Sequence, residues 1–348
     1  MPADPLVELI RSPRGRSAES GRRVLFVTNM WPEESRPWYG TFVHTQAGSL
    51  EALGIAVDVL YIRGYRTARA YARAVARALR LNAEADWDIV HAHYGHSGVA
   101  ARFDLRHPLV VSYCGDDLLG TLGADERPTR KSRAEVAVFR RLAHVARLTI
   151  TKSEAMERVL PPGCRADNRV IPNGVDLSRL EPQPRDEARA RLGWPAEDRV
   201  VLFVANPELP VKNYPLAVAA CERLRAEDPR VELRVAWGVP PAEIPTWMSA
   251  ADALILTSRA EGSPNVVKEA MACALPVVAT AVGDVPERLS GVAGCHAACH
   301  DPDDLAAGLR AALAHGRSPD ARAAVEALSL DRVAKRVNAV YDEALARR

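Results

Sequence analysis

The chain has 348 residues, of which 48% are hydrophobic and 26% charged, and its formal net charge is +2 at pH 7. This length gives room for roughly two domains with sizeable cores. The balanced charge argues against nucleic acid as a partner, and no apolar run is long enough to span a membrane. The six cysteines are scattered, so we expect a reduced cytoplasmic protein without a disulfide framework.

The chain begins with a segment that does not resemble a secretory signal. Residues 1–21 contain Asp4, Glu8 and Glu19 and have no long apolar core. We therefore expect these residues to form a mobile N-terminal tail.

The segment 22–181 alternates between predicted strands and helices. Buried strands are expected at 24–28, 57–62, 89–93, 109–113 and 148–151, with helices at 41–53 and 132–143. Apolar strands that alternate with helices are typical of an α/β doubly wound parallel sheet. We therefore expect a first Rossmann-like domain over residues 22–181.

A second set of the same kind follows. The segment after Pro182 and Pro184, around residues 185–191, is charged and is interpreted as a linker. Strands are then expected at 200–204, 231–236, 253–256 and 276–280, with helices at 215–226, 303–314 and 330–346. This predicts a second Rossmann-like domain over residues 182–328, and a C-terminal helix within 329–348 that packs back on the first domain. Two such sheets with loops at their strand ends predict a cleft between them.

The stretch Glu261–Glu269 follows the predicted strand at 253–256. Pro264 suits the first position of a helix, with Ser263 as its N-cap. Such a helix start offers free backbone N–H groups and the positive end of the helix dipole, which favour an anion. Asn265 and Glu269 are four residues apart and share a helix face. A sugar nucleotide, anionic in one part and rich in hydroxyls in another, suits this arrangement.

Two further features suggest phosphate binding. Lys212 follows the first strand of the second set, where ligands of such sheets bind and where a cation can neutralise a diphosphate. Gly40 and Thr41 start a helix after the first strand of the chain. Taken alone, Lys212 is better explained as a solvated surface residue, whereas Gly40-Thr41 is explained equally well as an ordinary strand–helix loop.

The stretch Glu261–Glu269 resembles the E-x7-E signature of family-4 retaining glycosyltransferases with the GT-B architecture. The pattern is closest to members that act in polysaccharide synthesis. The same family is indicated by segments on both sides of this stretch and in the first half of the chain: 250–252, 269–273, 275–280, 282–287, 170–176, 39–43 and 89–93. The resemblance covers roughly residues 22–345.

The resemblance implies a role for each site residue. Glu261 would contact hydroxyls of the donor sugar, Glu269 would bind the ribose diol, and Lys212 would stabilise the leaving diphosphate. The loop at Gly40 and Thr41 would close on the diphosphate, and the backbone from Gly262 to Val266 would cradle the sugar and diphosphate. That cradle comprises Gly262, Ser263, Pro264, Asn265 and Val266. His93 and Asp116 are candidates for the acceptor side.

The sequence departs from the family pattern at two places. Pro207 stands where the family usually has an arginine, so the diphosphate would depend on Lys212 alone or on another arginine such as Arg259. Cys114 stands where the family often has a histidine that contacts the 6-hydroxyl of the sugar. The base of the donor cannot be inferred, because the segment between Val231 and Asp252 is short.

Several residues of types that can bind metals are not interpreted as metal sites. The cluster Cys295-His296-Ala297-Ala298-Cys299-His300 is a single tight group, whereas structural zinc sites need two separated pairs. Asp88 opens a strand, and Asp301 or Asp303 suits a helix N-cap, so the D-x-D pairs at 86–88 and 301–303 are not interpreted as metal sites. We expect metal-independent transfer without a cofactor.

A basic amphipathic helix is predicted at 66–81. Its arginines recur at helical spacing: Arg66, Arg69, Arg73, Arg77 and Arg80. The row is explained either as a solvated face or as a contact with an anionic membrane or a lipid-diphosphate acceptor, which would place the protein at the inner face of the membrane.

These observations predict a glycosyltransferase that moves a hexosyl unit from a UDP- or GDP-sugar to a glycan or lipid-linked acceptor. Two alternatives share much of the pattern: a GT-B sugar-nucleotide epimerase, and a non-catalytic two-domain protein that closes on a sugar. The paired glutamates and Lys212 count against the second.

Overall fold

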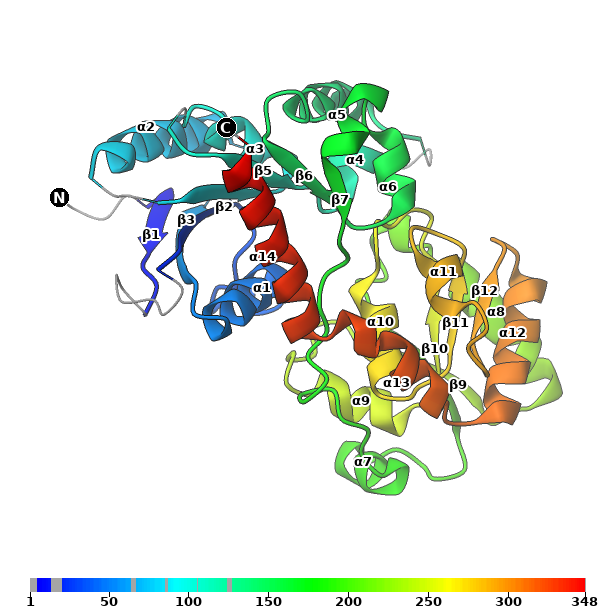
Figure 1. Ribbon diagram of the computed structural model, residues 1–348. Coiled ribbons are helices and arrows are strands. Elements are labelled where there is room, and N and C mark those ends of the chain that lie inside the picture. The colour runs from blue at the N-terminus through cyan, green and yellow to red at the C-terminus, as the bar shows by residue number, and fades with distance from the viewer. Residues whose placement is uncertain are drawn as a thin grey trace. The chain divides into compact units, whose positions relative to one another are not determined.

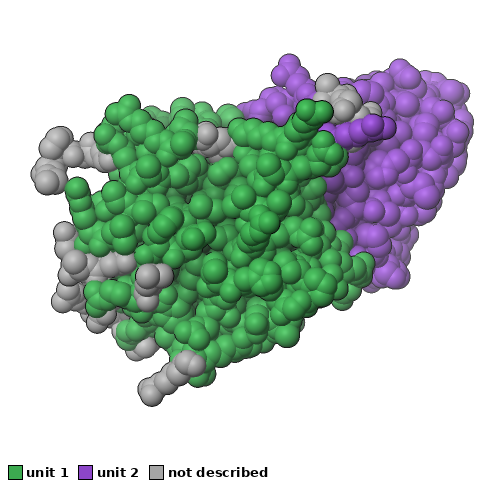
Figure 2. All heavy atoms as spheres, turned by 90° about the horizontal axis from the view of Figure 1, so that it is seen from above, with its two compact units in different colours: residues 1–121, 128–174, 330–348 green, residues 122–127, 175–329 purple. Residues whose placement is uncertain are grey.

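The computed structural model describes residues 5–13, 21–63, 67–84, 87–104, 106–123 and 127–347 (Figure 1). Contacts divide the chain into two compact units, coloured separately in Figure 2. Unit 1 comprises residues 1–121, 128–174 and 330–348, and unit 2 comprises residues 122–127 and 175–329. The last helix of the chain thus belongs to unit 1, although unit 2 precedes it in the sequence.

Unit 1 is built on a seven-stranded sheet with the order β1-β3-β2-β4-β5-β6-β7. Six of its strands are parallel: β2 (Arg23–Thr28), β3 (Ala56–Ile62), β4 (Ile89–His93), β5 (Leu109–Ser112), β6 (Leu148–Thr151) and β7 (Asn168–Val170). The strands β3, β4, β5 and β6 are buried throughout. Their apolar runs could be predicted because a parallel sheet is covered on both faces.

Helices cover both faces of this sheet (Figure 1). On one face lie α1 (Thr41–Ala52) and α14 (Leu330–Ala346), and on the other α2 (Ala68–Glu84), α3 (Gly95–Ala101) and α5 (Arg130–Leu142). Two short helices, α4 (Asp116–Leu119) and α6 (Glu154–Val159), and the 3-10 segment η1 (Pro162–Asp167) complete the unit. Within α14, the buried Tyr341 makes a 2.7 Å hydrogen bond with Nδ1 of His91.

The expectation of a mobile tail over residues 1–21 was wrong for Val7–Ile10. These residues form β1, which pairs antiparallel with β3 from Val7↔Ile62 to Ile10↔Val59. The following turn is held by the buried carboxylate of Asp58, which accepts hydrogen bonds from the Ser12 backbone, Arg11 and Trp87. A four-residue strand carries little periodicity, and its pairing depends on an edge supplied by a distant segment.

Unit 2 is built on a five-stranded parallel sheet with the order β12-β11-β10-β8-β9. Its strands are β8 (Arg199–Phe203), β9 (Val231–Val235), β10 (Ala253–Leu256), β11 (Val277–Thr280) and β12 (His296–Ala298). Its helices are α7 (Arg185–Leu192), α8 (Tyr214–Glu227), α9 (Ile244–Ala250), α10 (Asn265–Ala272), α11 (Val285–Leu289), α12 (Pro302–His315) and α13 (Pro319–Val325), with 3-10 turns η2 (Pro210–Lys212) and η3 (Glu326–Leu328).

The charged segment at 185–191 is not a linker. It forms helix α7, and the guanidinium of Arg189 is buried at 1% exposure. Arg189 donates to the carboxylate of Asp252 at 2.7 Å and to the backbone carbonyls of Ala250 and Asp198, among others. A run of charged residues is usually exposed to solvent. Here the contacts with Asp252 and with backbone carbonyls bury Arg189 instead.

Both sheets are doubly wound, as predicted. Counted along their parallel strands, each has the order 2-1-3-4-5, which unit 1 extends by a sixth strand. The strand order reverses between β2 and β4 in unit 1 and between β8 and β10 in unit 2. Sheets of this order bind ligands beyond the carboxyl ends of the strands at such a switch point. This rule directs attention to the loops after β2, β4, β8 and β10.

Candidate active site

The switch point of unit 2 brings two candidate residues into contact. Lys212 lies in η2 after β8, and Glu261 lies in the loop after β10. The Lys212 Nζ is 2.6 Å from Oε1 of Glu261, and the hydroxyl of Ser258 donates to the same oxygen at 2.8 Å. Both charged side chains keep partial solvent exposure, 25% for Lys212 and 18% for Glu261. The two charges are therefore placed together at a surface that a ligand can reach.

The loop that carries Glu261 is fixed by neighbouring strand ends. The Thr257 hydroxyl donates to the carbonyls of Lys212 and Asn213 at 2.9 and 3.0 Å. The carbonyl of Ser258 accepts from the Thr280 hydroxyl at 2.7 Å and lies 2.9 Å from Nε2 of His300. These bonds tie the η2 turn that carries Lys212 to the ends of β10 and β11, so the Lys212–Glu261 pair is fixed against the sheet.

Gly283 supports the same loop by a close backbone approach. It has φ of +58°, and a Cβ placed there would lie 2.4 Å from the carbonyl oxygen of Gly262 and 2.8 Å from that of Glu261. Real Cβ atoms do not come so close to a backbone oxygen. The position therefore requires glycine for its conformation and for the space that the Glu261–Gly262 backbone occupies.

Helix α10 begins one residue later than predicted. Its N-cap is Pro264 and its first residue is Asn265, so Ser263 does not cap the helix. The Ser263 hydroxyl instead donates to the carboxylate of Asp284 at 2.8 Å and accepts from the buried Lys268 at 3.0 Å. A buried ion pair bridged by a hydroxyl competed with the cap. The backbone N–H groups of the first turn, starting at Asn265 and Val266, have no acceptor within the helix.

Glu269 lies one turn after Asn265 on α10, and both side chains are partly exposed. Its carboxylate makes no hydrogen bond with any residue that the structure describes. Burial raises the pKa of the Glu269 carboxyl above its ordinary value, while Arg179 and Lys268 oppose that rise. A ligand that donates hydrogen bonds would satisfy this carboxylate.

Arg259 is placed close to Lys212 by the chain. Its backbone N–H donates to the carbonyl of Val211 at 2.8 Å, and its guanidinium donates to Oδ1 of Asn213 at 2.9 Å. Pro207, which stands where the family usually has an arginine, lies in the loop between β8 and η2. Arg259 thus contacts the residues on both sides of Lys212 in the chain.

In unit 1, Gly40 and Thr41 follow β2 at the switch point. Gly40 is the N-cap of α1 with φ of 72°, and Thr41 is the first residue of the helix. A Cβ at Gly40 would lie 2.3 Å from the carbonyl carbon of Met30 and 2.4 Å from the nitrogen of Trp31. The loop is therefore folded tightly on itself, which brings the start of α1 back to the end of β2.

His93 ends β4, the other strand of that switch point. It is fully buried, its Nε2 is 2.9 Å from Oε1 of Gln46, and its ring packs against Phe26 and His91. Burial lowers the pKa of His93 well below its ordinary value, so the imidazole is neutral. His93 is thus a neutral, buried side chain at the carboxyl end of β4.

The loop after β5 carries Cys114 and Asp116. The carboxylate of Asp116 accepts hydrogen bonds from the Tyr94 hydroxyl at 3.1 Å and from the Thr121 hydroxyl at 3.2 Å. Burial raises the pKa of the Cys114 thiol, which remains protonated. The structure thus gathers Gly40, His93 and Asp116 at the carboxyl edge of unit 1, as Lys212, Glu261 and Glu269 are gathered at that of unit 2.

Sequence reasoning missed two charged residues at the edge of unit 1. Asp117 is buried and accepts backbone N–H bonds from Cys114, Gly115 and Gly95, and burial together with Asp116 raises its pKa to about 7. Lys152 directly follows β6 and is 2% exposed. A polar residue at the end of a buried strand was the available signal for Lys152.

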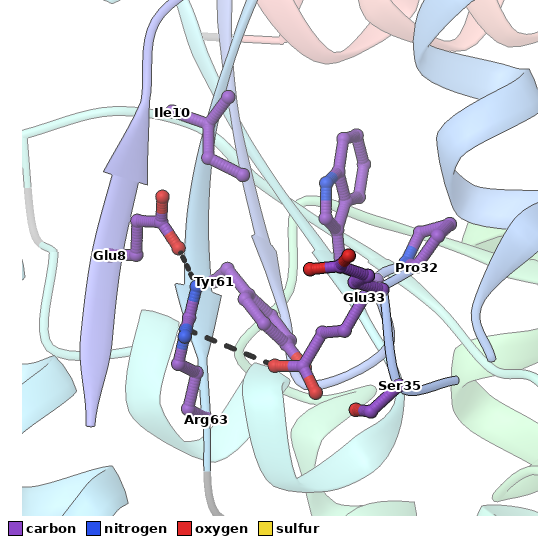
Figure 3. A pocket seen from close by; sticks show the side chains of 9 residues that line it. Glu8, Ile10, Pro32, Glu33, Ser35, Tyr61 and Arg63 are labelled. Atoms are coloured by element: carbon purple, nitrogen blue, oxygen red, sulfur yellow. Dashed lines mark hydrogen bonds and ion pairs between the residues drawn. The ribbon is translucent and has the colours of Figure 1, made fainter. Parts of the chain in front are cut away.

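A hollow beside the β2–α1 loop of unit 1 was not predicted. It encloses about 670 Å³ and is lined by Glu8, Trp31, Glu33, Glu34, Tyr61 and Arg63, among others. Arg63 is ion-paired with Glu8 and Glu33, as Figure 3 shows, and the Tyr61 hydroxyl donates to Glu33 at 3.0 Å. Burial, followed by the hydrogen bond to Glu33, raises the pKa of Tyr61 to about 12. These carboxylates are largely satisfied within the pocket.

The possible metal ligands have other partners. His296 lies 2.8 Å from a carboxylate oxygen of Asp304, Cys295 accepts from the backbone of Val277, and His300 contacts Ser258. Asp301 caps α12 as predicted, accepting from the backbone N–H groups of residues 303 and 304. Among the described residues, no group of three or more His, Cys, Asp or Glu side chains is arranged to hold a metal ion.

The predicted basic helix is α2. Arg69, Arg73 and Arg80 are exposed and Arg77 is partly exposed, while Ala70 and Ala74 face the core. Arg66 lies outside the described residues. Within the described ranges, no helix combines the length and apolar character needed to cross a membrane.

Comparison with known proteins identifies the family. The profile of Glycosyltransferase Family 4 matches residues 16–179, and that of Glycosyl transferases group 1 matches residues 234–315. A D-inositol 3-phosphate glycosyltransferase of Geodermatophilus obscurus is 31% identical over 87% of this chain and 76% of its own length. The chain belongs to glycosyltransferase family 4. The predicted resemblance is thereby confirmed, and the protein is a glycosyltransferase.

Other family-4 relatives and fold neighbours agree. The putative teichuronic acid biosynthesis glycosyltransferase TuaC of Bacillus subtilis is 24% identical over 76% of this chain and 82% of its own length. The sucrose-phosphate synthase of Thermosynechococcus elongatus has a TM-score of 0.76 at 20% identity, covering 94% of this chain and 100% of that one. Anabaena HepE, solved with UDP and glucose, has a TM-score of 0.65 at 19% identity, covering 91% and 98%. These neighbours confirm the GT-B fold.

Proposed function

We propose that this family-4 glycosyltransferase moves a hexosyl unit from a UDP- or GDP-sugar to a glycan or lipid-linked acceptor, with retention of configuration and without a metal. The contact of Lys212 with Glu261 at the switch point of unit 2 is the observation that carries the proposal. Side chains that the sequence separates by 49 residues meet where such sheets bind ligands. The pair places a cation beside a hydrogen-bond acceptor, as a diphosphate next to a sugar requires.

Each group has a distinct task in this proposal. Lys212 and the first-turn N–H groups of α10 face the diphosphate, whose negative charge grows as the bond to the sugar breaks. Glu261 accepts hydrogen bonds from the sugar hydroxyls and, before the donor binds, holds Lys212 in place. Glu269, whose carboxylate has no hydrogen bond to a described residue, accepts from the ribose diol.

The bond changes balance without a metal or an external base. The bond from the anomeric carbon to the phosphate oxygen breaks, and its electron pair leaves with the diphosphate. The acceptor oxygen forms the new bond on the same face of the sugar, and its proton passes to a leaving phosphate oxygen. Lys212 stabilises the resulting diphosphate, which is why a preplaced cation contributes more to the transition state than to the bound donor.

The relatives support the choice of substrates. HepE was solved with UDP-glucose, which favours a UDP-sugar for this chain. The matched relatives are named for transfer to D-inositol 3-phosphate and for teichuronic acid biosynthesis, so both a polyol phosphate and a glycan are suitable acceptors to test. The exposed arginines of α2 would suit an acceptor or membrane surface that is anionic, and co-sedimentation with anionic vesicles tests that prediction.

Thermal-shift measurements and donor hydrolysis together test the proposal. UDP, GDP and ADP with their sugars are screened against the wild type and Lys212→Ala, with EDTA present in a parallel series. We expect one nucleotide class to stabilise the wild type, and turnover of its sugar to survive EDTA but to fall in the variant. Binding without turnover for any acceptor would favour a sugar-binding protein, and loss of turnover in EDTA would contradict metal independence.

A further inference from the structure

Lys152 is a buried cation at the carboxyl edge of unit 1 for which the reaction above has no role. It directly follows β6 and is 2% exposed. Its ammonium forms no hydrogen bond and no ion pair with any residue that the structure describes. Its Nζ is nevertheless not fully occluded, so a ligand atom can contact it.

The nearest charged groups do not compensate the ammonium. Asp117 attracts it, but the two side chains form no ion pair in the described structure. The Asp117 carboxylate is already held by three backbone N–H groups, and the thiol of Cys114 is protonated. His91 and His93, on the neighbouring strand β4, are neutral because burial lowers the pKa of each.

The sheet register places Lys152 beside Cys114. Ser112 of β5 pairs with Ile150 of β6, and Cys114 and Lys152 each lie two residues further along their chains. Residues two apart on neighbouring parallel strands point to the same side of the sheet. His93 of β4 pairs with Ser112 and therefore lies on the same side of the sheet, two residues before the level of Cys114 and Lys152.

A buried ammonium without a partner is unfavourable, because it has lost water and gained no compensating hydrogen bond. Burial accordingly lowers the pKa of Lys152. A ligand that supplies the missing acceptor would remove this cost. An anion supplies both the charge and the hydrogen-bond acceptors that this ammonium lacks.

We propose that Lys152 binds an anionic substituent, a carboxylate or a phosphate, on a sugar or polyol ring of the substrate. The proposal rests on the glycosyltransferase function above and narrows its substrates. The anion has two possible sources: the carboxylate of a hexuronosyl donor, and the phosphate of a polyol-phosphate acceptor. Neutral hexoses and unphosphorylated polyols leave the ammonium unpaired and are poorer substrates.

Matched substrate pairs distinguish the two sources. The donor arm compares UDP-glucuronate with UDP-glucose, and the acceptor arm compares inositol 3-phosphate with inositol, for the wild type and Lys152→Met. A charge-assisted hydrogen bond of this kind predicts a preference for the anionic member of roughly 10- to 100-fold in kcat/KM. Lys152→Met abolishes that preference on one arm, which identifies the source. Lys131→Met removes an exposed lysine of unit 1 and leaves both preferences unchanged.

Equilibrium binding supplies a readout that does not require turnover. Glucuronate and inositol 3-phosphate are tested one at a time for thermal stabilisation of the wild type and Lys152→Met, with UDP as a check of the donor site. We expect one of the two anions to stabilise only the wild type, and UDP to stabilise both proteins. Lys152→Met itself should melt no lower than the wild type, because it removes an unpaired buried charge.

The outcomes separate this inference from the proposed function. A wild type that prefers neither anionic substrate, or a Lys152→Met variant that keeps the preference and the anion-induced stabilisation, overturns the role of Lys152. Absence of UDP binding and of transfer in the wild type contradicts the proposed function. In that case anion binding that depends on Lys152 would still establish the site.

Discussion

The close approach of Gly283 to the loop of Glu261 gives a sharp prediction for Gly283→Ala. The new Cβ would start 2.4 Å from the carbonyl oxygen of Gly262. Since an ordinary contact needs about 3.4 Å, the loop must move by about 1 Å, and the alanine must also adopt φ of +58°. The left-handed conformation alone costs about 1 kcal/mol, and the forced shift adds about 1–3 kcal/mol.

Gly291→Ala is the matched control. Gly291 also lies in unit 2 and has φ of +73°, but a Cβ there would meet no atom within 4 Å. Gly291→Ala therefore carries the cost of a left-handed backbone conformation but causes no steric collision. Urea unfolding should show a loss of about 1 kcal/mol for Gly291→Ala and about 2–4 kcal/mol for Gly283→Ala.

Kinetics test the functional part of the same prediction. A shift of about 1 Å in the loop moves Glu261 away from its place beside Lys212, and a displacement of this size commonly costs about 100-fold in rate. We expect kcat/KM for the donor to fall by that order in Gly283→Ala and to change little in Gly291→Ala. Equal stability losses and equal rates for the two variants would refute the argument that the loop position depends on Gly283.

Three further predictions concern charged side chains of unit 2. Lys212→Ala should lower kcat by about 100-fold, because its cation acts on the leaving group, and steady-state rates near those of the wild type would contradict that role. Burial raises the pKa of the Glu269 carboxyl, so this group takes up a proton at a higher pH than an ordinary glutamate, and donor binding should weaken there as the pH falls. Glu269→Gln should flatten this part of the pH profile of kcat/KM. A profile that is the same in the variant and the wild type would contradict the role of Glu269 in donor binding. Arg189→Met should lose about 3–5 kcal/mol in urea unfolding, because the Asp252 carboxylate loses a buried partner, whereas the exposed Arg191→Met should change stability by less than about 0.5 kcal/mol.

The elements that sequence predicts best are those that local pattern determines. The strand at Ala253–Leu256 and the helix at Leu330–Ala346 were predicted to the residue, because one is a short buried apolar run and the other has sustained amphipathic periodicity. The start of α10 was misplaced because Ser263 is engaged by Lys268 and Asp284, and Asp284 lies 21 residues away. A preference of serine for the N-cap position depends only on neighbouring residues, so it could not account for a partner as distant as Asp284.

The errors share a tertiary origin. The segment at 185–191 has the composition of a solvated linker, yet Arg189 is buried because it binds the Asp252 carboxylate and the Ala250 carbonyl, both more than 60 residues away, as well as carbonyls of the loop that follows α7. The strand β1 forms because β3 presents a free edge to Val7–Ile10. Neither partner can be inferred from the segment alone.

Only part of the candidate site could be predicted from the sequence. Lys212 and Glu261 could be proposed from their loops and from the family resemblance, but their 2.6 Å contact follows from the adjacency of β8 and β10. Lys152 and Asp117 were not proposed, and the one signal in the sequence was the position of Lys152 at the end of a buried strand. What distinguishes Lys152 in the structure is that its ammonium forms no ion pair and no hydrogen bond with a described residue.

The central claim is retaining transfer from a nucleotide sugar at the site of Lys212 and Glu261. Proton NMR of the first product formed from an α-linked UDP- or GDP-sugar, followed in EDTA with the wild type and Glu261→Ala, tests it most directly. The account predicts an α-linked product from the wild type and a much slower reaction with Glu261→Ala. A β-linked product, or an α-linked product formed equally fast by the variant, would contradict it.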